Sequence, residues 1–436
     1  MRIRRSFLFA GAAIVAVALF AGCDPQDKND GQEEQKQNQE PKVELKEGAV
    51  KEHSFSRGNP SPLRLELSDD ESQLFQKSDS FSIKLFNRVS ELKGQENFCI
   101  SPLSLQVGFG MVANGLDDYC YAELSEGLFG EYVDKSLLNN SYGRLKSALE
   151  HTNCVKLSNG IWLREGLRYK ESFLEAARQN YCEPGYLDFR SEIQASYDSI
   201  CQWAYDNTYG KLRKLDLGDF NTGILSVITN ATWFSSSWAV PFFPDSTKDG
   251  EFKLADGRTQ TVKMMKARFG NSIDAYYNLD LDKYLVVSLP FKDDSFRMDF
   301  FVPKGEETIE SIIGDIDWSV PFAYNRKVCF SMPRFSINTD IRLIPVLKDL
   351  GMSNIPLWPL DNMAYTSPSL QIRHINQNLK IDVMEKGVDA VVATPFVMGL
   401  SMYRDSITID RPFIFAIRDN VSGSFLFMGR VNSIEQ

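Results

Sequence analysis

Apolar and polar residues alternate along residues 388 to 401, between two strand-like runs near the C-terminus. One set of alternate positions is mostly apolar: Val388, Ala390, Val392, Thr394, Phe396, Met398 and Leu400. The other set comprises Asp389, Val391, Ala393, Pro395, Val397, Gly399 and Ser401. A period of two with one apolar face is typical of a strand, whereas surface loops are usually polar and rich in turn residues. The pattern alone therefore favours a strand.

Helical and strand periods both occur in the rest of the chain. Ser68 offers an N-cap for a helix that reaches Leu92, and helical spacing predicts further helices near 119–129, 135–151, 169–180, 192–209 and 343–350. Strands are predicted at 97–100, 154–164, 224–234, 378–384, 413–417 and in a last segment ending near Val431, and residues 250–303 are rich in β-type patterns. The run 224–234 is almost continuously apolar or β-branched, as a central strand requires. These elements indicate an α+β fold.

The N-terminus carries the pattern of a secretory signal. Arg2, Arg4 and Arg5 precede an apolar run from Phe7 to Ala21, which is too short for a comfortable membrane span. The run ends in Leu19-Phe20-Ala21-Gly22-Cys23, which resembles a bacterial lipobox with an unusual Phe20. This resemblance implies that residues 1–22 are removed and that Cys23 becomes the lipidated first residue. A soluble secreted protein with an unmodified Cys23 is the alternative.

A polar segment follows Cys23. Residues 24–42 contain no aromatic and no large aliphatic side chain, so they cannot bury enough apolar surface to become ordered. The predicted organisation is a signal peptide over 1–22, a lipidated, disordered polar tether over 23–65 and one folded domain over 66–436. Asp24 and Asp27 resemble surface-export signals of Bacteroidetes lipoproteins. We therefore expect a lipid-anchored protein in the outer membrane of a didermic bacterium, on the cell surface or the periplasmic face.

Composition restricts the classes of molecule that this protein could bind. The chain has 436 residues and a net charge of -10, which argues against nucleic acid because phosphate binding needs a basic face. Besides Cys23, the chain has six cysteines, so disulfides are allowed in an oxidising compartment without a deducible pairing: Cys99, Cys120, Cys154, Cys182, Cys201 and Cys329. Three histidines and no C-x-x-C spacing make no zinc site. We expect no metal and no cofactor.

Several short motifs resemble those of the serpins, the serine protease inhibitors that trap their targets by loop insertion. They are Ser101-Pro102-Leu103-Ser104, Asn230 to Phe234 followed by Trp238 and Pro241 to Thr247, Leu289-Pro290-Phe291, Phe330 to Phe335, Glu385 to Thr394, Asp410 to Phe413, and Phe427 to Val431. Their order covers the chain from about residue 66 to its end. The resemblance implies a serpin fold, with a large central β-sheet, additional sheets, about eight or nine helices and an exposed reactive-centre loop over 387–409.

The resemblance also implies roles for individual residues. The hinge of the loop comprises Glu385, Gly387, Val388, Ala390, Val392, Ala393 and Thr394. The region where the sheet opens comprises Ser101, Ser104, Asn230, Trp238 and Gln377. Sixteen positions beyond the hinge glutamate is Ser401, so the reactive bond is expected at Ser401–Met402, with Leu400 and Tyr403 as alternative positions. We expect a monomer that forms covalent complexes with elastase-like or subtilisin-like serine proteases.

Three positions depart from the family pattern. Gln377 replaces a usual His, and its amide can still donate to and accept from Asn230, without titrating. Val388 replaces a usual Thr or Ser. Pro395 lies in the segment that must insert, where it would forfeit one ladder hydrogen bond worth about 0.5 to 1.5 kcal/mol. We interpret the chain as an inhibitor, with a non-inhibitory surface lipoprotein of the same fold as the alternative.

Two other classes of function fit the sequence less well. A hydrolase would need an activated nucleophile, but the sequence has no G-x-S-x-G, H-E-x-x-H or P-loop motif, and only His151 and His374 could act as bases. A glycan-binding surface lipoprotein would share the signal and the tether but gives no reason for the 385–412 pattern. We therefore do not expect an enzyme.

Overall fold

The computed structural model describes residues 10–21, 45–47, 49–52, 54–55, 58–240, 242–266, 273–275, 277–292, 294–319, 326–366, 369–385 and 406–435. These residues form three sheets and eight α-helices, which confirms the predicted α+β fold. The predicted loop from 386 to 405 lies outside the described residues.

The largest sheet has six strands in the order β13-β14-β1-β5-β3-β4. These strands are β13 (Phe335–Arg342), β14 (Leu370–Val383), β1 (Ala10–Ala21), β5 (Ile224–Phe234), β3 (Val155–Arg164) and β4 (Gly185–Leu187). All 11 residues of β5 are buried, as its continuous apolar pattern predicted. The centre of this sheet is thus covered on both faces.

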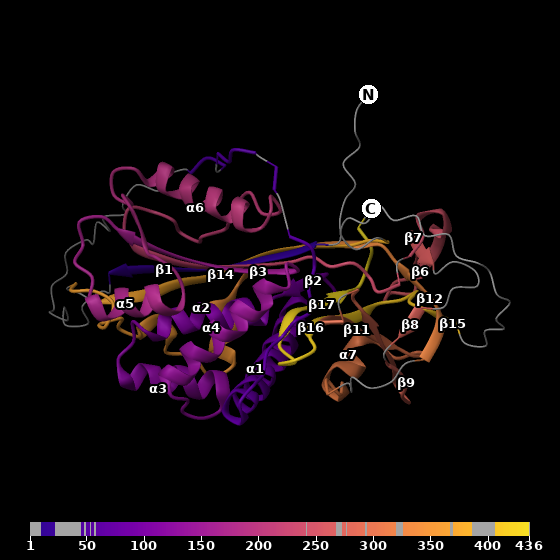
Figure 1. The fold of residues 1–436 in the computed structure, drawn as a ribbon. Coiled ribbons are helices and arrows are strands. Elements are labelled where there is room, and N and C mark those ends of the chain that lie inside the picture. The colour runs from indigo at the N-terminus through magenta and orange to yellow at the C-terminus, as the bar shows by residue number, and fades with distance from the viewer. Residues whose placement is uncertain are drawn as a thin grey trace, which may run out of the picture.

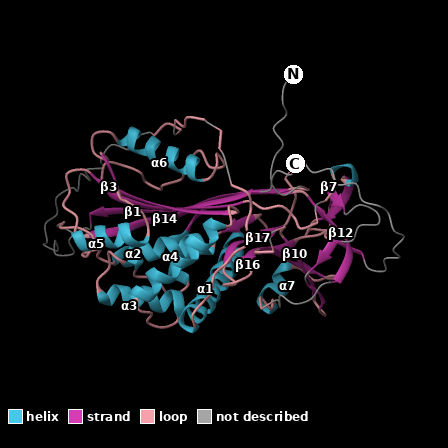
Figure 2. Ribbon diagram, viewed as in Figure 1, coloured by secondary structure: helices cyan, strands magenta, loops and turns pink. Residues whose placement is uncertain are grey.

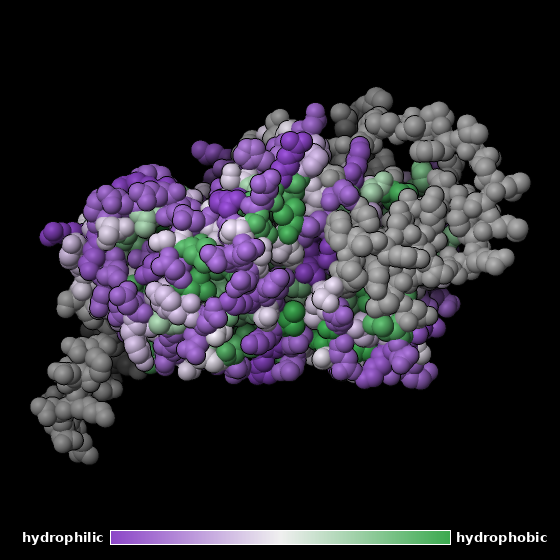
Figure 3. Space-filling model, turned by 60° about the horizontal axis from the view of Figure 1, so that its bottom comes forward, coloured by the Kyte–Doolittle hydropathy of each residue, from purple (hydrophilic) through white to green (hydrophobic). Residues whose placement is uncertain are grey.

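Helices cover both faces of the central sheet (Figures 1 and 2). On one face lies α6 (Ile193–Asn207). The opposite face carries α1 (Asp69–Lys93), α2 (Pro102–Ala113), α3 (Asp118–Phe129), α4 (Lys135–His151) and α5 (Glu171–Asn180). Two short helices, α7 (Ile309–Ile312) and α8 (Leu343–Asp349), complete the set among the described residues. The face turned toward the viewer in Figure 3 is mainly hydrophilic, with separate hydrophobic areas.

The first helix shows how closely local sequence sets these boundaries. The Ser68 side chain accepts from the Glu71 backbone N–H, and the Glu71 carboxylate accepts from the Ser68 N–H, which is a complete capping box. Pro102 occupies the first position of α2, where its missing N–H costs no hydrogen bond. The predicted helices at 119–129, 135–151, 169–180, 192–209 and 343–350 all exist, shifted by a few residues at most.

Two further sheets pack beside the central one. A six-stranded sheet has the order β2-β17-β16-β11-β10-β9 and comprises β2 (Phe98–Ile100), β17 (Phe425–Val431), β16 (Phe413–Asp419), β11 (Phe296–Pro303), β10 (Tyr284–Pro290) and β9 (Tyr277–Asp280). A five-stranded sheet contains β15 (Ser406–Thr408), β12 (Arg326–Pro333), β7 (Thr259–Lys266) and β6 (Lys248–Lys253) in that order, and its fifth strand, β8 (Ile273–Ala275), pairs with β12. Most buried apolar side chains join one continuous core, to which β16 contributes its first five residues and β17 contributes Phe425 to Met428 and Val431.

The N-terminal apolar run differs from expectation, because the structure places it inside the fold. Residues 10–21 form β1, which pairs antiparallel with both β14 and β5. Small and β-branched residues with no charge suit a strand buried on both faces as well as they suit a signal sequence, so the hydrophobic pattern cannot separate the two. Removal of residues 1–22 concerns processing and stays a prediction. No helix among the described residues is long and apolar enough to cross a membrane.

The second half of the predicted tether differs from expectation. The composition argument rested on residues 24–42, which lie outside the described residues, but the described parts of 45–65 pack on the domain. The Leu63 N–H donates to the buried Ser295 hydroxyl (2.7 Å), and the Ser61 N–H donates to the Thr152 carbonyl (3.0 Å). Ordered structure therefore begins well before Ser68, through contacts that leave no periodic signal in the sequence.

Candidate functional site: the opening of the central sheet

The site is the position between β5 and β14, which β1 fills. Ala10 lies opposite Asp382 of β14, and Ala21 lies opposite Leu370, so β1 starts beside the carboxyl end of β14 and runs back along it. On its other edge, Gly11 lies opposite Phe234 and Ala18 opposite Val227. β14 and β5 are consequently parallel to each other and separated by one antiparallel strand.

The two faces of β1 meet different surroundings. Ala13, Val15, Val17 and Leu19 join the main core on the face that carries α2. Ala12, Ile14 and Ala16 join a second apolar cluster, which contains Ile193, Tyr197, Ile200 and Ala204 of α6. A strand in this position is therefore buried on both faces, between the core and α6.

Two amides flank the centre of this position without touching. Val15 lies opposite Gln377 in β14 and opposite Asn230 in β5, so one residue of β1 separates the two. The prediction that Gln377 faces Asn230 directly is therefore wrong here, because β1 stands between them. Gln377 Oε1 accepts from the Ser101 N–H and its Nε2 donates to the Ser101 carbonyl, both at 2.9 Å.

Asn230 has partners of its own on the other side. The Ser104 hydroxyl donates to Asn230 Oδ1 (2.6 Å), the Thr232 hydroxyl donates to the same oxygen (3.1 Å), and Asn230 Nδ2 donates to Asn159 Oδ1 (2.8 Å). Ser101 and Ser104 thus tie the start of α2 to one strand each, Ser101 to β14 and Ser104 to β5. This neutral amide–hydroxyl network holds the two strands that flank the opening.

The end of the opening nearest the loop is closed by Trp238 and Glu385. The Trp238 indole is 3% exposed, stacks on Phe291 at 4.8 Å between ring centroids and donates to the Met384 carbonyl at 3.0 Å. The Glu385 carboxylate is buried and accepts from Arg334 Nε (2.6 Å) and from the Thr247 hydroxyl. The first residue of the predicted hinge is thereby fixed to β12–β13 and to the segment before β6.

The structure describes only some of the site residues that the sequence predicted. Six of the predicted residues lie along the position between β5 and β14, and their roles in hinge motion and sheet opening stay predictions: Ser101, Ser104, Asn230, Trp238, Gln377 and Glu385. Cys23 and the remaining loop positions lie outside the described residues: Gly387, Val388, Ala390, Val392, Ala393, Thr394, Leu400, Ser401, Met402 and Tyr403. Asn159, Thr247 and Arg334 were missed as partners, although Thr247 and Arg334 stand within recognised motifs and Arg334 is a cation able to pair with Glu385.

Histidines, cysteines and possible metal ligands are the other candidates for chemistry. His151 contacts the Ser147 carbonyl at 2.6 Å on α4, whereas His374 of β14 lies 4.0 Å from Asp219, and burial lowers the pKa of His374. No group of three or more metal-ligating side chains occurs in the part of the chain that the structure describes. Cys99, Cys120, Cys182, Cys201 and Cys329 are free thiols, and burial raises the pKa of Cys120 to about 12 and that of Cys182 to about 11.

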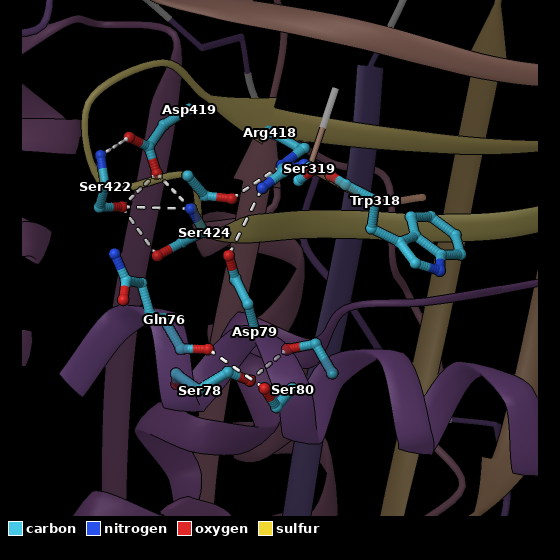
Figure 4. Close-up of polar contacts among 12 residues, drawn as sticks. Gln76, Ser78, Asp79, Ser80, Trp318, Ser319, Arg418, Asp419, Ser422 and Ser424 are labelled. Carbon is cyan, nitrogen blue, oxygen red and sulfur yellow. Dashed lines mark hydrogen bonds and ion pairs between the residues drawn. The ribbon is translucent and has the colours of Figure 1, made fainter. Parts of the chain in front are cut away.

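A second buried polar cluster lies away from the opening, where α1 meets the end of β16 (Figure 4). Arg418 lies over the Phe425 ring and donates to the Trp318 and Gly423 carbonyls and to Asp79 Oδ2 (3.4 Å). Asp419 accepts from the backbone N–H groups of Val421 (2.9 Å), Ser422 (2.6 Å) and Ser424 (3.1 Å). Burial raises the pKa of Asp79 to about 7, against the opposing attraction of Arg418. This ionic cluster contrasts with the neutral network of the opening.

The fold matches solved structures of one family. The chain superposes on maspin with a TM-score of 0.72 and 22% sequence identity, covering 84% of this chain and 100% of that one. A structure of cleaved Serpin 42Da gives a TM-score of 0.70 at 19% identity, with 84% of this chain and 100% of that chain covered. At these identities the likeness concerns the fold alone.

Sequence comparisons lead to the same family. A "Serine protease inhibitor" of Cyanea capillata is 25% identical over 369 residues, covering 81% of this chain and 97% of the relative. The "Leukocyte elastase inhibitor" of Equus caballus is 25% identical over 383 residues, covering 83% of this chain and 99% of the relative. The family model described as "Serpin (serine protease inhibitor)" matches residues 76–434. With nearly all of its folded domain matched, the chain belongs to the serpin family of protease inhibitors.

Proposed function

We propose that this protein inhibits serine proteases as a suicide substrate. A protease cleaves the loop over 387–409, the freed segment enters the central sheet between β5 and β14, and the acyl-enzyme is trapped. The observation that carries the proposal is the position of β1: the sheet accommodates a strand of 12 residues between those two neighbours.

The direction of β1 is the direction that the loop would take. The chain leaves β14 at Val383, beside the residue that pairs with Ala10. A segment that turns there and runs back along β14 is antiparallel to it, as β1 is. Removal of residues 1–22 would take β1 out of the sheet and make its position available to the loop.

If residues 384–387 form the turn, Val388 lies opposite Val383, and this fixes the register of the inserted loop against β14. Val392, Thr394, Phe396 and Met398 would then take the places of Ala13, Val15, Val17 and Leu19, toward the main core. Thr394 would replace Val15 between Gln377 and Asn230, where its hydroxyl could bond to either amide. The apolar face predicted from the alternation thus coincides with the core-facing side of the sheet.

Pro395 would fall in the place of Ala16, on the face covered by α6. Its lost ladder hydrogen bond costs about 0.5 to 1.5 kcal/mol. Burial of Phe396, Met398 and Leu400 contributes roughly 1.5 to 3 kcal/mol each, in addition to about a dozen new hydrogen bonds. Insertion is favoured despite Pro395, although a slower start would let more acyl-enzyme hydrolyse.

The reactive bond is proposed at Ser401–Met402, with Leu400 and Tyr403 as neighbouring alternatives. Small or medium apolar residues here suit elastase-like and subtilisin-like proteases better than trypsin-like ones. The named relative that inhibits leukocyte elastase supports this class of target, without fixing it.

The test is to mix the processed protein with an elastase-like, a subtilisin-like and a trypsin-like protease and to analyse the products on a denaturing gel. A covalent complex, and a released peptide that starts at Met402 by mass spectrometry, are the expected results. Cleavage without a complex would refute the trapping mechanism. A fragment starting at Asp405 with trypsin trapped would place the bond at Arg404 and change the target class.

A non-inhibitory surface protein of the same fold is the second candidate. One neighbour of this fold is titled a thyroxine-binding globulin in complex with thyroxine, so the fold also serves binding. Pro395 and Val388 are the observations in this chain that favour it. Cleavage of the loop by all three proteases without any complex would support this candidate.

We further propose that a lipid on Cys23 anchors the protein in the outer membrane. The basic start, the apolar run and Gly22-Cys23 support the anchor. The wild-type protein should partition into membranes with its mature N-terminus at a lipidated Cys23, and Cys23→Ala should lose the lipid. A mature N-terminus at any other residue would refute this proposal.

A further inference from the structure

The segment between the polar tether and the domain docks along α6. We call the described residues 45–55 the strap; residues 48 and 53 within it are not described. In Figure 1 the indigo chain passes over α6, on the side away from the sheet. Nothing in the proposed inhibitory mechanism uses this segment.

The strap is held through its backbone by three side chains spaced four residues apart on α6. The Lys46 N–H donates to Gln194 Oε1 (2.9 Å), the Ala49 N–H to Asp198 Oδ1 (3.2 Å) and the Lys51 N–H to Gln202 Oε1 (2.6 Å). Side chains four apart share one face of a helix. The outer face of α6 therefore accepts hydrogen bonds from an extended backbone, much as the edge of a sheet does.

Side chains reinforce this docking at both ends. Leu45 and Val50 pack against the apolar cluster that α6 shares with β1. The centroid of the Phe55 ring lies 5.7 Å from that of Tyr205 and 5.4 Å from that of Tyr209. The Arg213 guanidinium, just beyond α6, donates to the Glu52 carboxylate at 2.5 Å. The strap thus spans the whole of α6 and the turn after it.

That turn is itself tied to β14. The Lys211 ammonium pairs with Asp382 (2.8 Å), and the Asp216 N–H donates to Asn378 Oδ1 (2.8 Å). Because Ala12, Ile14 and Ala16 of β1 share an apolar cluster with α6, a strand in the opening lies directly beneath this helix. A segment that enters from the Glu385 end must pass under α6, so α6 has to lift during insertion.

We infer that the strap controls how readily α6 lifts, and so sets the rate at which a strand enters the central sheet. This inference rests on the proposed insertion mechanism. It also gives the N-terminal tether a mechanical connection to the moving part of the molecule. Weakening the strap should speed insertion, and fixing it should slow insertion.

The first test uses Phe55→Ala and Gln202→Ala in the full processed chain, with Lys46→Ala as the matched control. Lys46 uses its backbone in the strap contact and its side chain is exposed, so its truncation leaves docking intact. Hydrogen exchange should show loss of protection at the Ala49 and Lys51 amides in the first two variants. The rate constant of covalent-complex formation should rise roughly 2- to 10-fold, as expected for loss of an aromatic contact.

The second test changes the rate in the opposite direction. Ala49→Cys combined with Asp198→Cys should link the strap to α6, and complex formation should be slower before than after reduction of the same sample. Strap amides that exchange freely in the wild type, or equal rates in all variants while the wild type still forms its complex, would overturn the inference. Absence of any complex in the wild type would instead refute the inhibitory function itself, so the two failures are distinguishable.

Discussion

Two buried polar clusters hold this protein together by different means. At the opening of the sheet, Gln377, Asn230, Ser101 and Ser104 bond through amides, hydroxyls and backbone groups that carry no charge. Beside α1, Arg418 and Asp419 are buried, Asp79 lies partly buried next to them, and Arg418 donates to the Trp318 and Gly423 carbonyls. Neutral partners can be exchanged at a cost of about 0.5 to 1.5 kcal/mol each, whereas separating buried charges costs several kcal/mol. The proposed moving region thus uses bonds that are easily replaced, and the static region uses bonds that are not.

The largest expected effect concerns the neutral region alone. Cutting the loop near residue 400 in the processed protein should raise the melting temperature by roughly 10 °C or more, because a freed strand becomes buried in the sheet. Val388→Arg should abolish both the rise and trapping, since its charge would be buried without a partner. Differential scanning calorimetry of cut and intact samples measures this. Coincident melting of cut and intact wild type would show that no strand enters.

The next largest effect is expected in the ionic region. Arg418→Met leaves the buried Asp419 and the partly buried Asp79 without their cation and should lower the free energy of unfolding by about 3 to 5 kcal/mol, measured by urea denaturation. Arg258→Met is the control, since the exposed pair of Arg258 with Asp256 is worth at most about 1 kcal/mol. Equal losses in the two variants would remove the energetic difference between buried and exposed charges on which the comparison depends.

The same cluster should make stability depend on pH. The folded state raises the pKa of Asp79 from 3.8 to about 7, mainly by burial. The stabilisation from protonated Asp79 is then fully present below pH 3.8 and is lost as pH rises to about 7. Relative to Asp79→Asn, the wild type should lose up to about 4 kcal/mol of unfolding free energy over this range. Parallel curves for the two proteins in urea titrations from pH 4 to 8 would show that Asp79 does not titrate there.

The smallest effect belongs to one hydroxyl of the neutral network. Ser104→Ala should lower the free energy of unfolding by only about 0.5 to 1.5 kcal/mol, because Asn230 Oδ1 still accepts from Thr232. It should also speed complex formation by loosening β5 from α2. Ser141→Ala is the control, since the buried Ser141 hydroxyl has no hydrogen-bond partner among the described residues. A loss above about 3 kcal/mol in Ser104→Ala would mean that the opening is not held by exchangeable bonds.

Much of this fold could be predicted from local sequence patterns. The capping box at Ser68, the proline at the start of α2 and the continuous apolar run of β5 each predict their element from neighbouring residues. The site residues were predicted from the family-like motifs instead. Taken alone, Trp238 or Glu385 could equally be an ordinary residue of a packed core.

What could not be predicted depends on distant partners. The run from Ala10 to Ala21 has no periodicity that separates a signal sequence from a doubly buried strand, and its neighbours lie far along the chain. The docking of the strap could not be predicted, because α6 binds its backbone N–H groups, and these are present whatever the side chains are. The direct contact of Gln377 with Asn230 was predicted from a family pattern, and only the register shows that Val15 separates them.

The register of β1 has a consequence for the order of events during synthesis. Ala10 pairs with Asp382, a partner made about 370 residues later, which is about 20 to 70 seconds at roughly 5 to 20 residues per second. Residues 10–21 must therefore wait until β14 has been synthesised before their place in the sheet exists. An export machinery that captures the N-terminus within that interval meets an unpaired apolar segment. Under the proposed processing of residues 1–22, early capture would keep residues 10–21 out of the fold, and late capture would leave them in the sheet.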